Sequence, residues 1–427
     1  MTFQKLNKKT SDKKIQFDVA VIGGGPSGMM AAARAAELGS RVVLIEKNQT
    51  LGNKLLLTGK GRCNLTRAEN NLKDFADSFG KQGRFLSSGL SVFGTKDTIN
   101  FFESHGLKTK IERGKRVFPV TDKARDVLNV LENCLKQGNV VVLKGRKVKT
   151  LEKSENKITN IVLEGGKRII AYNYIICTGG KSYPSTGSTG DGYAWTKKLG
   201  HTIIMPAPAL TPLKIKEKWT SKLQGLSLKN VEISVWQNNK KKDERFGEAL
   251  FTHFGISGPI ILGMSKNIGK LFKNGEVKLH LDLKPGLDEG KLDRRLQRDF
   301  EKYQNKFFKN ALDDLLPRKL IPLIIKLSGI HPNKETNSIT RQERQQLVCL
   351  LKQIKITVKG LVGFEKAIIT TGGVDLKEID SRTMKSKIIN NLYLAGEIIN
   401  LDGPSGGYNL QLCWTTGYLA GQSAATR

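Results

Sequence analysis

One stretch near the start of the chain, residues 17–47, constrains the fold more than any other. A short apolar run at residues 19–22 leads into the glycine turn GGGPSG of residues 23–28. A helix-compatible stretch with small residues follows, and a second apolar strand at residues 41–45 ends at Glu46. This order of strand, glycine turn, helix, strand and acid is typical of a dinucleotide-binding βαβ unit, whereas an isolated GxGxxG is weak evidence. The sequence therefore predicts an α/β fold with a Rossmann-like domain.

The glycine turn assigns a separate role to each of its glycines. Gly23 permits the tight turn, Gly25 lets the backbone approach a pyrophosphate, and Gly28 lets the helix pack closely on the sheet. The phosphate is then expected at the helix N-terminus, where free N–H groups and the helix dipole favour an anion. The predicted contacts of this turn are Gly23, Gly25, Pro26, Ser27 and Gly28.

The acid that ends the second strand predicts the kind of nucleotide. The Glu46 carboxylate can accept both ribose hydroxyls and would repel a 2′-phosphate. We therefore expect adenosine without that phosphate, with Glu46 and the adjacent Lys47 among its contacts.

A glycine-rich basic loop follows the acid at residues 58–66, and it is too irregular for a helix or a strand. Such a loop can wrap phosphates and the edge of a flavin, although a surface turn is the alternative. Glycine, lysine, arginine, cysteine and asparagine lie densely here, directly after the ribose acid, which favours a cofactor loop. The predicted contacts are Lys54, Gly61, Arg62 and Asn64.

Two later segments extend the predicted cofactor site. Residues 174–180 read as a buried strand ending in glycines, which brings backbone against a bound dinucleotide. Val148 is a candidate for a backbone contact to adenine, with a plain strand end as the alternative. The predicted contacts here are Val148, Thr178, Gly179 and Gly180.

A further predicted cofactor contact lies near the end of the chain. Residues 391–397 read as a strand ending in glycine and acid, and a helix begins after residues 403–409. The N-terminus of that helix would face flavin O2 and N1 and stabilise the anion of the reduced flavin. The predicted contacts are Gly396, Glu397, Gly407, Asn409 and Leu410. No second GxGxxG has its own βαβ unit, so NAD(P)H is expected only as a transient electron donor.

Composition excludes several other classes of protein. The five cysteines are scattered and never spaced CxxC, so neither a disulfide framework nor a metal site is expected, and a reducing cytoplasm fits. Residues 1–16 read as a loose basic tail rather than a signal peptide, and no apolar run is long enough to span a membrane. A cytoplasmic protein is the expectation.

The charge balance points to a polyanionic partner. The chain has 71 Lys and Arg against 39 Asp and Glu, a net charge of +32. A lysine-rich proteome is the alternative, but exchange of Arg for Lys would leave the net charge unchanged. We therefore expect contact with ribosomal RNA or a ribosome assembly intermediate, against a merely basic enzyme.

Periodicity divides the chain into a discontinuous FAD-binding domain and an insert. Residues 17–200 and 355–427 are predicted to form the FAD-binding domain. Residues 201–286 alternate apolar and polar side chains and predict a β-rich insert. Residues 287–354 predict a helical insert, in which Thr340 and Glu343 form a capping box and apolar residues 292, 296, 300, 303 and 307 share one side.

The motifs resemble known flavoproteins. With GGGPSG and Glu46 at its start and YLAGE near its end, the chain resembles the two-dinucleotide-binding-domain flavoproteins. In those proteins the last acid holds the FAD ribityl chain; that position is Glu397 here, where Asp is commoner. The stretches GNKLLLTGKGRCNLT, LFTHFGISGP, TTGGVDLKEID and YLAGEIINLDGPSGGYNLQ resemble the HI0933-like flavoprotein family, also labelled YhiN-like, BaiN-like or aminoacetone-oxidase-like. The resemblance covers nearly the whole chain after the tail.

The resemblance implies FAD as the cofactor and a FAD domain interrupted by a β-barrel-like and helical insert. Members have been linked to amine oxidation, to bile-acid reduction, and to reduction of a uridine to dihydrouridine in large-subunit (23S) ribosomal RNA. The net charge favours ribosomal RNA, because a small amine or steroid gives no reason for so basic a protein. The sequence leaves the target nucleotide, the choice between NADH and NADPH and the oligomeric state open.

Uridine reduction needs a hydride at C6, delivered from flavin N5, and an acid that protonates C5. Cys63, in the loop expected near the flavin, is the first candidate for that acid, with a packed structural thiol as the alternative. His253 in LFTHFGISGP is the second candidate, with a structural histidine as the alternative. Three classes stay open: an RNA-modifying reductase, a small-molecule oxidase or reductase, and a flavin-bearing RNA-binding assembly factor without turnover.

Overall fold

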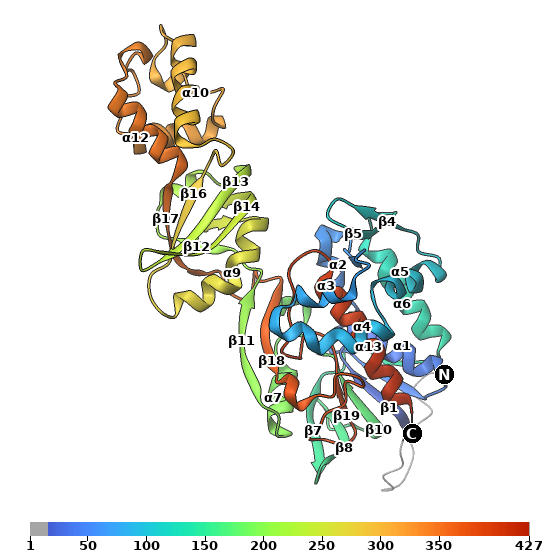
Figure 1. Cartoon of the computed structure of the whole chain (residues 1–427). Coiled ribbons are helices and arrows are strands. Elements are labelled where there is room, and N and C mark those ends of the chain that lie inside the picture. Colours follow the sequence, from blue (N-terminus) through green and yellow to red (C-terminus); the bar gives the residue numbers. More distant parts are fainter. Residues whose placement is uncertain (1–15, 427) are drawn as a thin grey trace. The chain divides into compact units, whose positions relative to one another are not determined.

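The chain divides into two units (Figure 1). A computed structural model describes residues 16–426, so all but the last residue of the predicted basic tail lies outside the described residues. One unit contains the chain up to Ala207 and again from Ile369, and the other is Pro208–Ile368. We call them the nucleotide unit and the insert unit.

The nucleotide unit is built on a parallel sheet of five strands. Their order is β19 (Leu392–Leu394), β10 (Ala171–Ile176), β1 (Phe17–Ile22), β2 (Val42–Ile45) and β6 (Val141–Leu143). All four neighbouring pairs are parallel. The strand at Tyr393 therefore shares a sheet with Val21, although the two lie at opposite ends of the sequence, and the predicted Rossmann-like α/β class is confirmed.

Different layers cover the two faces of this sheet. Val19 and Val21 pack in one buried cluster with α1 (Pro26–Glu37), α6 (Ala124–Gln137) and α13 (Tyr408–Ala425). Ala20 and Ile22 point to the other face, where they pack with β7 (Val148–Ser154), β8 (Lys157–Leu163), β9 (Arg168–Ile169) and α7 (Asp191–Lys198). Alternate side chains of one strand thus enter two cores, as burial on both faces requires.

Small residues bring α13 against α1. A Cβ added at Gly417 would lie 2.4 Å from the carbonyl oxygen of Ser27, and one at Gly421 would lie 2.3 Å from that of Ala31. Because both pairs are four residues apart, the two helices meet along one stripe where backbone touches backbone. The last helix therefore rests directly on the helix that follows the glycine turn.

The nucleotide unit also contains smaller sheets and further helices. A small antiparallel sheet has the order β3 (Thr66–Arg67), β5 (Arg116–Pro119) and β4 (Thr109–Glu112). The chain enters and leaves the insert unit through β11 (Ile203–Ala209) and β18 (Ile369–Val374), which pair with each other. The other helices are α2 (Asn53–Leu57), α3 (Leu72–Asp77), α4 (Ser87–Val92) and α5 (Thr95–Ser104).

The insert unit is a closed barrel that carries a helical part. Its strands run in the order β12 (Leu213–Ile215), β15 (Gly255–Ser257), β14 (Lys240–Thr252), β13 (Ser227–Gln237), β16 (Lys278–Asp282) and β17 (Ile354–Leu361). Helices α8 (Trp219–Lys222) and α9 (Pro259–Phe272) accompany the barrel. The helices α10 (Glu289–Lys302), α11 (Ile321–Ser328) and α12 (Arg341–Lys352) lie between β16 and β17 in sequence.

Two sequence-based expectations for the insert need correction. Strand β17 pairs with β12 and β16 in the barrel, so the chain returns to the nucleotide unit at Ile369 and not at about residue 355. The side chain of Phe307 is 43% exposed and follows the end of α10, so it does not continue the apolar side of that helix. The capping box of Thr340 and Glu343 is present at the start of α12.

A buried histidine gives the nucleotide unit a pH-dependent stability. His201 is buried, its Nε2 lies 2.8 Å from the Ser386 hydroxyl, and its Nδ1 lies 3.3 Å from the Thr196 carbonyl oxygen. Burial lowers the pKa of His201. An unfolded histidine titrates near 6.5, so below about pH 6.5 the unfolded chain binds a proton that the folded one does not.

We therefore expect the free energy of unfolding to fall as the pH drops from about 6.5 towards 5, by at most about 1.4 kcal/mol per pH unit from this residue. In the variant His201→Gln this part of the pH dependence should be lost. Denaturant unfolding of both proteins between these pH values measures it. Parallel pH profiles for the two proteins would contradict the assignment.

Candidate functional site

The glycine turn between β1 and α1 has the geometry of a dinucleotide site. Gly23 has a φ of 106°, and a Cβ there would lie 2.5 Å from the carbonyl oxygen of Cys177. A Cβ at Gly28 would lie 1.9 Å from the carbonyl oxygen of Gly23. At Gly25, by contrast, a Cβ would meet no atom within 4 Å. Two glycines therefore allow close packing within the protein, and the third borders open space.

The start of α1 leaves its N–H groups available to an anion. Gly25 is the N-cap, Pro26 is the first helical residue, no side chain caps the helix, and its first turn contains no acidic residue. The uncapped N–H groups and the positive end of the helix dipole therefore point towards the open space beside Gly25. This arrangement fits a pyrophosphate.

The acid at the end of β2 is held in place by backbone. Glu46 is 9% exposed, and its carboxylate accepts hydrogen bonds from the N–H of Gly24 at 2.7 Å and of Asn48 at 2.8 Å. An ionised carboxylate only accepts hydrogen bonds, and its two oxygens have more lone pairs than these two donors use. Glu46 can therefore also accept from ribose hydroxyls, as the sequence predicts.

The segment of residues 184–191, which we call the strap, is bound by the two residues that follow Glu46. Lys47 Nζ lies 2.8 Å from the carboxylate of Asp191 and donates to the Thr189 hydroxyl at 2.6 Å. The Asn48 side chain donates to the carbonyl oxygen of Thr186 at 3.0 Å. Lys47 therefore acts in the structure as the anchor of the strap, a role that the sequence did not suggest.

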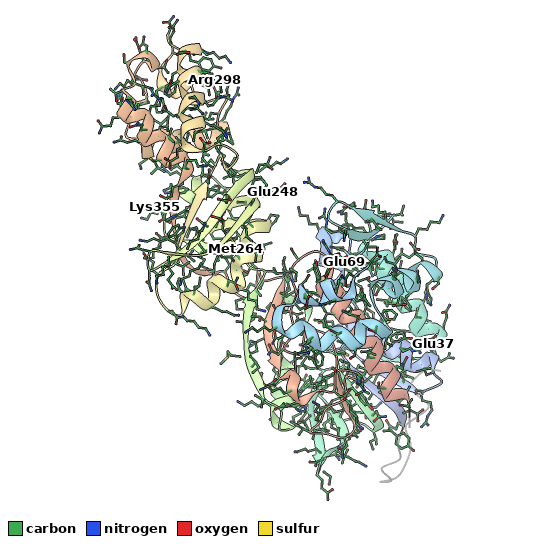
Figure 2. The ribbon with its side chains drawn as sticks, viewed as in Figure 1. Glu37, Glu69, Glu248, Met264, Arg298 and Lys355 are labelled. Atoms are coloured by element: carbon green, nitrogen blue, oxygen red, sulfur yellow. The ribbon has the colours of Figure 1, made fainter. Side chains whose placement is uncertain are left out.

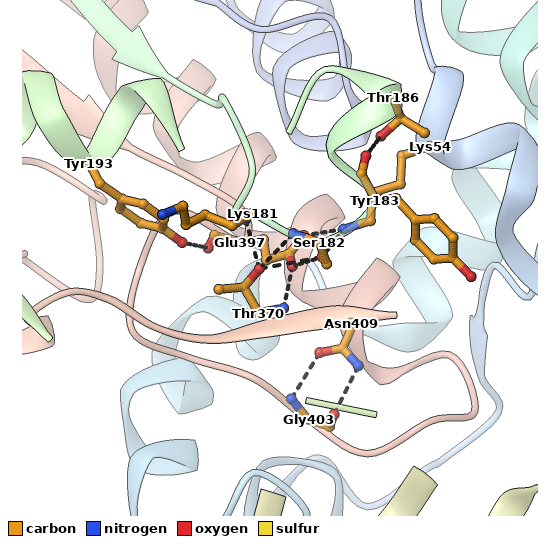
Figure 3. Close-up of polar contacts among 10 residues, drawn as sticks. All are labelled: Lys54, Lys181, Ser182, Tyr183, Thr186, Tyr193, Thr370, Glu397, Gly403 and Asn409. Carbon is orange, nitrogen blue, oxygen red and sulfur yellow. Dashed lines mark hydrogen bonds and ion pairs between the residues drawn. The ribbon is translucent and has the colours of Figure 1, made fainter. Parts of the chain in front are cut away.

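The second predicted acid lies at the centre of a polar network (Figure 3). Glu397 accepts from Lys54 Nζ at 2.7 Å, from the Ser182 hydroxyl at 2.8 Å and from the Thr370 N–H at 2.6 Å. The side chains of Lys54 and Glu397 are 21% and 14% exposed. Four segments that are distant in sequence thus meet at one carboxylate. Lys54 and Glu397 were predicted as cofactor contacts independently, and the structure joins them as an ion pair.

Two buried polar atoms in the predicted cofactor loops are candidates for contact with a ligand. Among the residues that the structure describes, Asn64 Oδ1 and Thr178 Oγ1 are buried and lack a hydrogen-bond partner. Buried polar atoms without a partner are rare in folded proteins and need an explanation. Both residues lie in loops that were predicted to contact the cofactor. These atoms, the space at Gly25 and the two acids fit FAD.

The C-terminal contacts act mainly through backbone and packing. Gly407 caps α13 with a φ of 101°, and a Cβ there would lie 2.4 Å from the carbonyl oxygen of Thr66. The Asn409 side chain accepts from the N–H of Gly403 and donates to its carbonyl oxygen, both at 2.9 Å. Asn409 therefore closes the preceding loop with its side chain (Figure 3). Leu410 packs against the buried cluster between the sheet and α1, α6 and α13, which we call the helix-side core.

The other predicted glycines allow close contacts around the same acid. A Cβ at Gly180 would lie 2.3 Å from Thr370 Oγ1, and one at Gly396 would lie 2.4 Å from Ser27 Oγ. Gly179 has a φ of 70°. Val148 is buried as the first residue of β7, where it pairs with Leu163. Gly61, with a φ of 86°, is exposed.

The structure does not support a phosphate-binding role for Arg62. Its guanidinium donates to both carboxylate oxygens of Glu112, at 2.8 and 3.0 Å, and to Asp122 at 3.1 Å. It also lies 4.0 Å from the centre of the Phe118 ring. Two carboxylates already balance the charge of Arg62, so we correct its role to that of a link between the basic loop and the β3–β5–β4 sheet.

Neither candidate for the proton donor gains support from the structure. Cys63 is fully buried in the helix-side core, where burial raises the pKa of its thiol to about 12. A substrate cannot contact a thiol that is enclosed in this way. His253 is an exposed residue in the turn between β14 and β15 of the insert unit.

Cys63→Ala tests the role of the thiol. From its burial we expect FAD to stay bound, the free energy of unfolding to fall by about 1 kcal/mol, and the reaction rate to stay within a few fold of the wild-type rate. Flavin reduction and product formation are measured separately. Loss of product with normal flavin reduction would restore Cys63 as the acid.

Several residues of the site were not predicted from the sequence. Ser182 and Thr370 bind Glu397, and Asp191 binds Lys47. Each lies in a glycine-rich segment that the sequence does single out, at 178–192 or 370–374. The sequence did not show which of these segments contact one another in the folded protein. Among the residues that the structure describes, no group of three potential metal ligands and no membrane-spanning helix was found.

Comparisons with known proteins agree with this geometry. The family model described as the HI0933-like protein Rossmann domain matches residues 17–423. The chain is 34% identical over 412 residues to the 3-dehydro-bile acid delta(4,6)-reductase of Clostridium scindens, covering 96% of this chain and 99% of that protein. It is 28% identical over 407 residues to the ribosomal RNA dihydrouridine synthase of Escherichia coli, covering 95% and 98%.

Solved structures share the fold at low sequence identity. A 3-ketosteroid-delta4-(5alpha)-dehydrogenase from Rhodococcus jostii aligns with a TM-score of 0.54 and 15% identity, covering 97% of this chain and 98% of that one. The open conformation of a flavocytochrome c3 fumarate reductase aligns with a TM-score of 0.52 and 16% identity, covering 100% and 84%. These likenesses support the fold and carry no information on the substrate.

Proposed function

The chain belongs to the HI0933-like protein family, a family of FAD-dependent oxidoreductases, and from this premise we propose that it reduces a uridine in large-subunit ribosomal RNA to dihydrouridine. We further propose NAD(P)H as the source of electrons. It would visit the flavin transiently, because the sequence contains one GxGxxG turn with its own βαβ unit.

The relatives' names support a common type of reaction. A dihydrouridine synthase saturates the C5=C6 bond of uracil, which is conjugated to the C4 carbonyl. A 3-dehydro-bile acid delta(4,6)-reductase acts on double bonds conjugated to a C3 ketone. In both cases a hydride adds to an electrophilic carbon conjugated to a carbonyl, which is the β carbon in uracil and the β or δ carbon in the dienone. A proton then adds to the other carbon of the same double bond. We propose this chemistry for the present chain.

The net charge is the observation that favours RNA over a small molecule. The chain has 71 basic and 39 acidic residues, a net charge of +32, and basic residues outnumber acidic ones in both units. A bile acid has a single carboxylate and needs one cation, whereas an RNA strand has one phosphate per nucleotide. So large an excess is expected of a protein that binds a polyanion.

FAD, when bound, supplies the hydride for this reaction. The free N–H groups at the start of α1, beside Gly25, would hold its pyrophosphate, and Glu46 would hold its adenosine ribose. Glu397, oriented by its hydrogen bond with Lys54, would hold the ribityl chain. We expect the purified protein to release FAD and no FMN on denaturation, which chromatography measures. FMN, or no flavin after FAD is supplied, would exclude this arrangement.

A second candidate function is reduction of a conjugated enone in a bile acid or steroid. It is favoured by the identity of 34% to the Clostridium scindens reductase, against 28% to the Escherichia coli synthase. The third class, an RNA-binding assembly factor without turnover, would bind RNA and leave the redox state of the flavin unchanged.

One anaerobic experiment separates the three classes. The FAD-loaded protein is reduced with NADPH or NADH and mixed either with unmodified, in-vitro-transcribed large-subunit ribosomal RNA or with a 3-oxo-4,6-diene bile acid. We expect the RNA to reoxidise the flavin and to contain dihydrouridine by mass spectrometry. Reoxidation by the bile acid alone would support the second class, and RNA binding without reoxidation the third.

A further inference from the structure

The small β3–β5–β4 sheet of the nucleotide unit carries a dense run of cations beside the loop at residues 58–66. Between residues 108 and 116, which form β4, the turn and the start of β5, five side chains are basic and only Glu112 is acidic. In Figure 1 this sheet lies at the edge of the nucleotide unit, close to α2. A basic edge next to the cofactor loop is therefore a candidate for substrate contact.

The acidic residues of this region are already engaged by other cations. Lys110 Nζ lies 2.6 Å from Asp122, and Lys115 Nζ lies 2.9 Å from Glu69, which Figure 2 labels. Hydrogen bonding to Arg62 lowers the pKa of Glu112, and hydrogen bonding to Lys110 lowers that of Asp122. These carboxylates stay ionised and paired at neutral pH.

Four exposed cations lie in the loop at residues 58–66, at the two ends of β4 or just before α6: Lys60, Lys108, Arg113 and Lys123. None of them forms an ion pair with a residue that the structure describes. We name these four residues the basic hairpin face. Their charges are uncompensated, so a polyanion can displace counterions from them and gain binding free energy.

The basic hairpin face is joined to the cofactor loop. Arg62 binds both oxygens of Glu112 on β4 and lies over the Phe118 ring on β5. The N–H of Leu65 donates to the carbonyl oxygen of Val117 at 2.9 Å. An anion bound to the sheet is therefore held in a fixed relation to the loop that contains Asn64, whose Oδ1 is buried and has no hydrogen-bond partner.

We propose that the basic hairpin face binds the phosphates of the RNA strand that carries the target uridine. This inference rests on the proposed function, because it takes RNA as the substrate. Phosphate contacts fix the register of a nucleic acid without reading its sequence. The face would thus position the strand next to the cofactor loop, and the choice of uridine would be left to contacts with the base.

A competing basic surface lies on α10 of the insert unit, where Figure 2 labels Arg298. Lys291, Arg294 and Arg295 lie on the same helix. Acidic residues compensate much of this charge: Lys291 Nζ is 3.2 Å from Asp288, and Arg295 Nε is 2.9 Å from Asp299. The charge on α10 is thus more nearly balanced, and its exposed arginines make a matched control.

The test compares two double variants that each remove two exposed cations. Lys108→Gln/Arg113→Gln changes the basic hairpin face, and Arg294→Gln/Arg298→Gln changes α10. The probe is the same in-vitro-transcribed ribosomal RNA, and its affinity is measured by fluorescence anisotropy between about 50 and 200 mM salt, the range over which phosphate contacts change affinity steeply. The slope of log affinity against log salt should become shallower by roughly one per lost phosphate contact, so by about two for the first variant and not for the second.

FAD content and the unfolding midpoint show whether each variant is folded. Lys123→Gln, which changes the member of the basic hairpin face that lies between β5 and α6, gives an independent measurement with about half the change in slope. An unchanged slope in the hairpin variant would overturn the inference. A shallower slope in the α10 variant instead would show that the insert unit binds the RNA phosphates. Failure of the proposed function is a separate result, because it would appear in the wild-type protein as absence of dihydrouridine.

Discussion

Gly25→Ala is expected to leave the protein folded and to abolish its retention of FAD. A methyl group at Gly25 meets no protein atom within 4 Å, and Gly25 has a φ of −82°, which alanine adopts without strain. The same methyl group would fill the space through which a pyrophosphate approaches the backbone and the start of α1. We expect the affinity for FAD to fall by roughly 100-fold, or about 2.7 kcal/mol.

Gly28→Ala should show the opposite pattern, although it is the same chemical change three residues away. Its methyl group would lie 1.9 Å from the carbonyl oxygen of Gly23, so the helix must move away from the sheet. We expect the free energy of unfolding of the FAD-free protein to fall by about 3 kcal/mol or more. Denaturant unfolding and a titration with FAD, followed by flavin fluorescence, measure both effects.

Gly286→Ala is the matched control for these two variants, since a Cβ there also meets nothing within 4 Å and the residue lies in the insert unit. It should change neither stability nor FAD binding. If Gly25→Ala bound FAD as the wild type does, the pyrophosphate would have to lie elsewhere. If Gly28→Ala had the wild-type free energy of unfolding, α1 would be able to move away from the sheet without destabilising the protein.

The second large effect is expected at the ion pair between Lys54 and Glu397. Glu397→Gln leaves the ammonium group of Lys54 largely buried beside a neutral amide, and Lys54→Met leaves the carboxylate without its cation. Breaking such a pair from one side costs more than removing both charges, because the remaining charge is poorly solvated. We expect each single variant to lose about 2 kcal/mol of unfolding free energy, less than for a fully buried pair because both side chains are partly exposed.

The double variant Lys54→Met/Glu397→Gln should be more stable than the sum of the two losses predicts, which a double-mutant cycle measures. Both variants that lack the carboxylate should also bind FAD more weakly, since Glu397 is the expected ribityl contact. Lys54→Met alone should keep much of that affinity. Strict additivity of the three unfolding free energies would show that the pair does not act as a unit.

The sequence predicted the nucleotide turn well because the information there is local. Glycines at fixed spacing, a strand before them and an acid after them lie within residues 17–47, and the structure shows the close packing expected at Gly23 and Gly28 and open space at Gly25. The strand at Tyr393 was also placed in the right sheet. This prediction followed from the return of the βαβ pattern after the insert.

The sequence-based predictions were wrong where a structural feature depends on contacts between segments that are distant in sequence. Strand β17 alternates apolar and polar side chains as any half-buried strand does, so its pattern cannot say which sheet it joins. Helix α9 begins directly after Gly258, within residues 201–286, which the sequence predicts only as β-rich. Cys63 lies in a loop that the sequence singles out as a cofactor loop, but no sequence pattern shows which way a side chain of an irregular loop points.

The order of segments along the chain also determines when each unit can fold during synthesis. The insert unit is continuous, residues 208–368, and all six strands of its barrel exist once those residues have been translated. The nucleotide unit lacks β19 and α13 until translation is almost complete, although its glycine turn is made first. Until α13 arrives, the face of α1 that contains Ser27 and Ala31 has no partner. The insert unit is therefore expected to fold in the nascent chain before the nucleotide unit can fold. Nascent chains arrested before residue 392 should not bind FAD.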